Sequence, residues 1–63
     1  PPMIFSMHMY SSSEQDRWVE VNNRRLHEGD MIDNKVRIEH IEQQNVILNF
    51  QGQTFSMSAL SEW

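Results

Sequence analysis

The sequence predicts an all-β domain, a small antiparallel barrel or sandwich of five or six short strands. Three observations lead to this prediction. Apolar and polar residues alternate with a period of two in several segments, which is the pattern of half-buried strands. Short stretches containing asparagine or glycine separate these segments, as expected for tight turns. The chain has 63 residues, which is enough for one such domain at most.

The alternation is found in five segments, which are FSMHMY (5–10), RWVEV (17–21), KVRIEH (35–40), NVILNF (45–50) and QTFSMS (53–58). Because successive side chains of a strand point to opposite faces, the apolar residues of each segment are expected to share the core side. They are Phe5, Met7, Met9, Val19, Val21, Val36, Ile38, Val46, Leu48, Phe50, Phe55 and Met57.

Short polar stretches predict the connections. The pair NN at 22–23 fits a two-residue type I′ hairpin, because asparagine tolerates a positive φ. The pair QG at 51–52 is expected to form a similar turn, and the glycine of EGD at 28–30 permits a left-handed turn. A fourth turn is predicted for EQQN at 42–45. The helix-like stretch SSSEQDRW at 11–18 is too short and too polar for more than one turn.

The stretch VNNRRLHEGDMI, at 21–32, packs charged residues between apolar ones. Such a cluster indicates either a chemical site or the corners of a very small β-domain. The turn signals favour the second interpretation, with strand, turn, short strand, turn and strand in succession. We therefore expect its charged side chains on the solvent side of a narrow ribbon.

Composition excludes several classes of protein. Five basic against nine acidic residues give a net charge of −4 and a pI near 5.1, a poor match for nucleic acid or an anionic membrane. There is no cysteine, and therefore no disulfide framework and no thiolate metal site. No apolar run approaches the roughly 20 residues of a membrane span, and no signal peptide is visible.

No constellation in the sequence indicates catalysis. His8, His27 and His40 have no partner at metal-ligand spacing. The serines at 11–13 form a polar loop rather than a nucleophile elbow, and the carboxylates cluster at turns. We expect no metal site, no cofactor and no enzymatic activity, with the histidines at the surface.

The N-terminal segment is the strongest candidate for a binding site. It alternates apolar residues, contains no Lys, Arg, Asp or Glu, and lacks the charges that usually protect an edge strand. It is therefore either a core strand or an edge to which a partner strand adds. A hairpin arginine pair adds positive charge for an acidic partner. The predicted partner-binding residues are Ile4, Phe5, Ser6, Met7, His8, Met9, Tyr10, Arg24 and Arg25.

Two stretches, HMYSSSEQDRWVEVNNRRLHEGD at 8–30 and VILNFQGQTFSMSAL at 46–60, resemble the C-terminal periplasmic domain of the type II secretion system protein B family. The order and spacing of several weak motifs carry this resemblance, which spans positions 5–60. The matching residues are His8, Tyr10, Ser11, Arg17, Val19, Val21, Asn22, Glu28, Gly29, Asp30, Leu48, Gln51, Gly52, Gln53 and Phe55.

The sequence departs from the family pattern at three positions. Asn23 and Asn45 replace turn glycines, and Ser58 replaces a common proline. Asparagine is the next-best residue for a positive φ, so both hairpins are expected to form.

The resemblance implies a protein anchored in the inner membrane, in which 1–3 end a Pro-containing linker and 4–63 form one periplasmic β-domain. The domain is similar to the homology region of secretion protein C and to pilus-assembly protein P, which engage an outer-membrane secretin. The implied function is binding of the secretin's N-terminal periplasmic domain, which positions or stabilises the channel through strand addition along 4–10. Other inner-membrane secretion components and a second copy of the chain are further implied partners.

Two alternatives remain open at this point. An oligonucleotide-binding barrel would use a basic stripe that includes Arg17, Lys35 and Arg37, with Trp18 or Tyr10 stacking on bases. A purely structural module would associate with itself through an edge strand.

Overall fold

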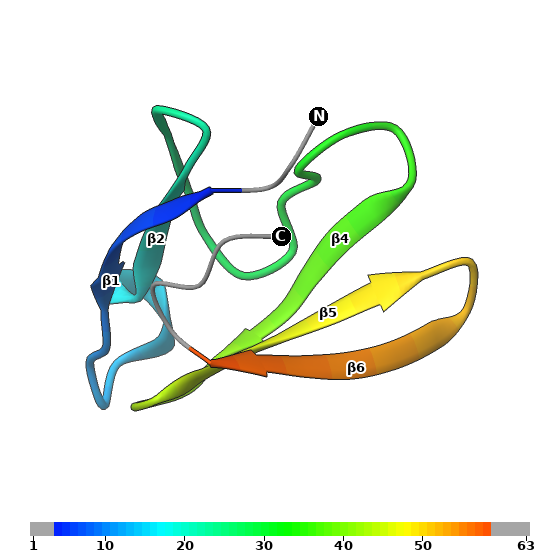
Figure 1. Cartoon of the computed structure of the whole chain (residues 1–63). Helices are drawn as coiled ribbons and strands as arrows, with labels where there is room; N and C mark the ends of the chain where they lie inside the picture. Colours follow the sequence, from blue (N-terminus) through cyan, green and yellow to red (C-terminus); the bar gives the residue numbers. More distant parts are fainter. Residues whose placement is uncertain (1–3, 59–63) are drawn as a thin grey trace.

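The computed structural model describes residues 4–58, which form six strands and one 3₁₀ turn (Figure 1). In chain order the elements are β1 (Phe5–Met9), η1 (Glu14–Asp16), β2 (Trp18–Val21), β3 (Arg24–Leu26), β4 (Val36–Ile41), β5 (Asn45–Phe50) and β6 (Gln53–Ser58). They make two three-stranded antiparallel sheets, in the orders β1-β2-β3 and β4-β5-β6. The all-β prediction is confirmed. Within residues 4–58 no strand pairing closes the two sheets into a barrel.

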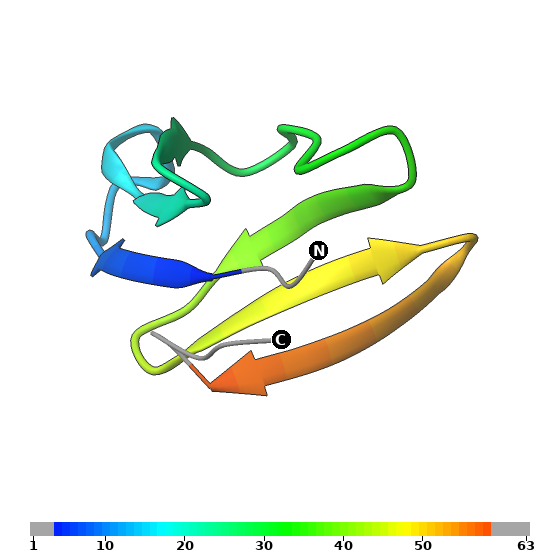
Figure 2. The ribbon, with the colours of Figure 1, turned by 45° about the horizontal axis from the view of Figure 1, so that its top comes forward.

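Both sheets contribute to a single apolar core, and Figure 2 shows the β4-β5-β6 sheet beside strands β1, β2 and β3. The buried residues are Phe5, Val19, Val21, Leu26, Ile32, Val36, Ile38, Ile41, Val46, Leu48 and Met57. Phe55 is partly buried and packs against this cluster. The period-two pattern located most of these residues, because inward positions alternate along each strand. Phe50, the last residue of β5, was expected in the core but is 39% exposed.

The predicted core positions of Met7 and Met9 in β1 are wrong. The register between β1 and β2 shifts between Phe5 and Met7, which marks a β-bulge. An extra residue in one strand turns every following side chain to the opposite face. Met7 and Met9 are therefore each 46% exposed, whereas His8, expected at the surface, stands opposite a buried valine and is half-buried.

The predicted turns are confirmed. Asn22 and Asn23 have φ of 50° and 68°, the left-handed pair that a type I′ hairpin requires. Gln51 and Gly52 follow the same pattern, with φ of 53° and 82°, between β5 and β6. The single helical turn expected within 11–18 is η1. Asn45 is the first residue of β5 and does not have a positive φ. The expectation that it takes the place of a left-handed turn glycine is therefore wrong, although the β4–β5 hairpin forms.

The connection between β3 and β4 covers the outer edge of β4. Gly29 N–H donates to Ile38 O at 2.7 Å, Ile38 N–H donates to Asp30 O, and Ile32 N–H donates to Val36 O. Figure 2 shows this connection running alongside β4. The backbone groups of β4 in this stretch are thereby satisfied within the chain, and this edge does not offer a site for an added strand.

The predicted linker at 1–3 and the last five residues of the predicted 4–63 domain lie outside the described residues. Among residues 4–58 there is no helix of the length and apolarity needed to cross a membrane.

Candidate partner-binding edge

Strand β1 is one of the two edge strands of its sheet, and β3 is the other. Its only strand partner among residues 4–58 is β2. Just before the strand, Ile4 N–H donates to Asn22 Oδ1 and Ile4 O accepts from Asn22 N–H, which fixes the start of β1 to the β2–β3 hairpin. The strand contains no Lys, Arg, Asp, Glu or Pro, the residue types that usually prevent edge pairing. The remaining edge of β1 is therefore suited to accept another strand.

The bulge gives β1 an exposed apolar side as well. Ile4, Met7 and Met9 are 44–46% exposed. Met7 stands opposite Glu20 and Met9 opposite Trp18, so the two methionines lie on the outer face of the sheet with these β2 residues. Methionine side chains are flexible and polarizable, and they adapt to varied contact surfaces.

The outer face continues from β1 to β3 through an aromatic contact. The guanidinium carbon of Arg25 lies 3.9 Å from the ring centre of Trp18, a cation–π arrangement. Glu20 stands opposite Arg25 in the sheet, and its carboxylate accepts a hydrogen bond from the Ser6 hydroxyl. We call Met7, Met9, Trp18 and Arg25 the outer-face cluster.

The structure does not bring all nine predicted partner-binding residues together. Met7, Met9 and Arg25 belong to the outer-face cluster, and Ile4 precedes the same edge. Phe5 faces the core. Ser6 bonds to Glu20 on the outer face, and the other three predicted residues, His8, Tyr10 and Arg24, lie away from the cluster.

Arg24 is exposed on β3, and its guanidinium bonds within the chain. Its Nη2 donates to Ile32 O at 2.6 Å and more weakly to Met31 O, which ties the hairpin to the β3–β4 connection. The Nε2 of His8 is buried and has no hydrogen-bond partner within the described part of the chain. Tyr10 lies after β1 and turns toward Arg17.

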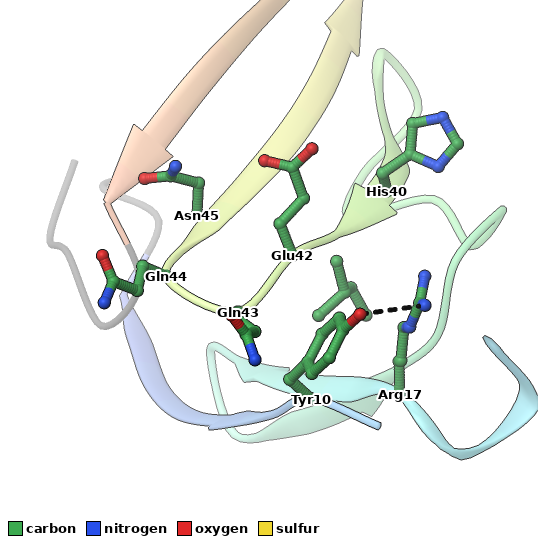
Figure 3. A pocket seen from close by; sticks show the side chains of 8 residues that line it. Tyr10, Arg17, His40, Glu42, Gln43, Gln44 and Asn45 are labelled. Atoms are coloured by element: carbon green, nitrogen blue, oxygen red, sulfur yellow. Dashed lines mark hydrogen bonds between the residues drawn. The ribbon is translucent and has the colours of Figure 1, made fainter. Parts of the chain in front are cut away.

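The side chain of Tyr10 belongs to a polar cavity of about 690 Å³, lined also by Arg17 and residues 40–45 (Figure 3). Arg17 donates to Ser11 O at 2.6 Å, to Glu28 Oε2 at 3.2 Å and to the Tyr10 hydroxyl at 3.3 Å. Three of its five N–H groups are thus used within the chain. The guanidinium therefore links the segment after β1 to the β3–β4 connection.

Glu28 is the centre of this arrangement. One carboxylate oxygen accepts from Arg17 and from the backbone N–H of Ile41, at 2.7 Å, and lies 3.9 Å from His40 Nδ1. Only 13% of the Glu28 side chain is exposed. The expectation that every charged residue of 21–32 faces solvent is wrong here, because Glu28 links the loop before β2 to the end of β4.

Sequence reasoning missed the place of Trp18 in the outer-face cluster and the structural role of the Arg17–Glu28 pair. The alternation in RWVEV did place Trp18 and Glu20 on the face away from the core, so the signal for the outer face was present. Nothing in the local pattern could pair Arg17 with Glu28, because eleven positions and one hairpin separate them. Among the described residues, no group of three or more His, Asp or Glu side chains is placed to hold a metal.

Comparison with known proteins identifies the family of this chain. The family model described as "Type II secretion system protein B" matches residues 1–59. This chain belongs to that family. The resemblance that the sequence motifs indicated is confirmed.

Individual members of the type II secretion system protein B family are similar to the whole chain. General secretion pathway protein B of Klebsiella pneumoniae is 36% identical over 63 residues, and that of Dickeya dadantii (strain 3937) is 40% identical. The chain spans only 36% and 29% of the lengths of these two relatives. The crystal structure of Dickeya dadantii GspB from the type 2 secretion system superposes with a TM-score of 0.96 at 40% identity, over 100% of this chain and 75% of that one.

Proposed function

We propose that this chain is a non-enzymatic adaptor domain of a type II secretion system, held in the periplasm by a protein anchored in the inner membrane. Its partner is the N-terminal periplasmic domain of the outer-membrane secretin, which it positions or stabilises. Membership of the family supports the link to secretion. The secretin and the periplasmic location are the finer part of the proposal, and their support is the resemblance of the sequence motifs to small domains of the secretion protein C and pilus-assembly protein P kind.

Strand β1 is the proposed contact, and its exposed, uncharged edge is the observation that carries the proposal. A partner strand alongside its five residues would form about four or five backbone hydrogen bonds. At about 1 kcal/mol each, these bonds barely offset the cost of association. The single contact is therefore of modest affinity, and repetition around a secretin ring strengthens it.

The test is an NMR titration of the isotope-labelled domain with the secretin's N-terminal periplasmic domain. Shifts concentrated at 4–10 are the expected result. His8 stands opposite Val19, whose backbone pairs with Leu26 of β3, so the His8 N–H points to the free edge of β1. His8→Pro removes this donor at an edge position, where proline is tolerated, and is expected to weaken binding. Circular dichroism checks that the variant is folded. A folded His8→Pro domain that binds as well as the parent would refute strand pairing, and no shift with the parent domain would refute the secretin proposal.

Self-association through β1 is a second candidate function, favoured by the same uncharged edge. It predicts concentration-dependent dimerisation of the domain without any added protein. The oligonucleotide-binding alternative has less support, because the described sheets do not close into a barrel and Arg17 and Arg24 are engaged within the chain.

A further inference from the structure

Backbone pairing along an edge strand is nearly indifferent to sequence, so side chains beside the edge must select the partner. We infer that the outer-face cluster makes this selection: Met7, Met9 and Trp18 accept an extended segment with apolar side chains at two positions, i and i+2. This inference rests on the proposed function, because that segment is the secretin strand that pairs with β1.

The β-bulge creates the receiving surface. Without it Met7 and Met9 would point into the core, and with it both point outward, two residues apart and half-exposed. Side chains directly opposite each other on neighbouring strands have Cβ atoms about 4.5–5.5 Å apart. The outward side chains of an added strand at i and i+2 therefore contact Met7 and Met9 in turn.

The charge of this surface determines the chemistry of the segment. Residues 4–13 include no Lys, Arg, Asp or Glu. The outward charges beside this surface belong to β2 and β3. The Glu20 carboxylate, opposite Met7, accepts a hydrogen bond from Ser6, and the Arg25 guanidinium lies over the Trp18 ring. Both groups are engaged within the chain, so a charged partner side chain over the methionines loses water for little ionic gain, whereas an aliphatic or aromatic one gains contact. The segment is therefore apolar at both positions.

Trp18 extends the outer face of the sheet from β1 onto β2. It is the cross-strand neighbour of Met9, and Arg25 stacks on its ring at 3.9 Å. The stack limits the rotamers of both side chains, so Arg25 acts as a positioning residue for the indole. The exposed residues of β6 are different in character: Gln53, Thr54 and Ser56 offer a polar surface that does not select apolar side chains.

The test compares two double variants in titrations with the secretin's N-terminal periplasmic domain. Met7→Thr with Met9→Thr keeps strand propensity and removes the apolar surface. The matched control is Met31→Thr with Phe50→Thr, which removes exposed apolar side chains of 44% and 39% exposure away from β1. The first variant is expected to bind at least about tenfold more weakly, and the control within about twofold of the parent. The indole N–H signal of Trp18 is expected to shift on binding.

Each outcome separates the inference from the proposed function. If the parent domain binds through β1 and the Met7→Thr/Met9→Thr domain binds equally well, the inference is wrong and the function stands. If the parent domain does not bind, the proposed function fails first. If the parent dimerises through the same methionines and the secretin domain does not dissociate the dimer, the occupant is a second copy of the chain and the inference is overturned.

Discussion

Replacing Glu28 with alanine is expected to cost this domain much of its stability. One carboxylate oxygen of Glu28 accepts from Ile41 N–H at 2.7 Å and from Arg17 Nη1 at 3.2 Å. The side chains of Glu28 and Arg17 are only 13% and 15% exposed. The substitution therefore removes two bonds and leaves a partly buried cation and a backbone N–H without their acceptor.

The size of the effect follows from these two bonds. A hydrogen bond to a charged group contributes about 1.5–3 kcal/mol. Arg17 keeps its bonds to Ser11 O and to the Tyr10 hydroxyl, which limits its share of the loss. We expect a loss of about 3 kcal/mol in the free energy of unfolding. A domain of this size has roughly 3–9 kcal/mol in total, so the melting temperature should fall by more than about 10 °C.

Urea unfolding followed by circular dichroism measures this loss. Glu28→Gln retains an oxygen for Ile41 N–H and is expected to lose about half as much. The control is Glu14→Ala, which removes an exposed carboxylate of η1 and should change stability by less than about 0.5 kcal/mol. A Glu28→Ala domain as stable as the Glu14→Ala domain would refute the role assigned to the Glu28 link.

Four further predictions follow from the same structure. Ile38→Ala, at a fully buried position, should cost about 2–5 kcal/mol in urea unfolding, and a loss below 1 kcal/mol would contradict the described core. His8→Phe removes a buried ring nitrogen without a partner and should raise the melting temperature, whereas a lowered one would indicate that the nitrogen is satisfied. Asn23→Gly should leave the β2–β3 hairpin as stable or more so, while Asn23→Val should destabilise it by more than about 1 kcal/mol, because φ is 68°. Secretin binding should change less than about threefold between low and high salt, and a steep decrease would indicate an ionic contact instead of the uncharged β1 edge.

Much of the fold was predictable because it depends on local chemistry. The period-two alternation defined β2, β4, β5 and β6, and the asparagine pair at 22–23 predicted its own left-handed turn. These features need only the preferences of neighbouring residues. The all-β class followed from them without knowledge of tertiary contacts, and the family followed from the resemblance of the motifs in their order and spacing.

The site was predictable only in part, because its geometry depends on pairing between strands. The alternation located β1 but left open whether it is a core strand or an edge. The bulge after Phe5 reverses the sides of Met7 and His8, and no local signal marks it. The alternation assigned the methionines to the core, yet their exposure is what makes β1 a candidate binding surface. The Arg17–Glu28 link is equally non-local, since the two side chains meet only after the first sheet has folded.

The most direct test of the central claim, that β1 is the pairing edge, is amide hydrogen exchange of the labelled domain with and without the secretin's N-terminal periplasmic domain. An added strand would protect outward-facing amides within 4–10 that exchange quickly in the free domain, and would leave β6 unchanged. Protection confined to 22–27 would move the contact to the β2–β3 hairpin. Unchanged exchange along β1 at saturating partner would contradict strand addition altogether.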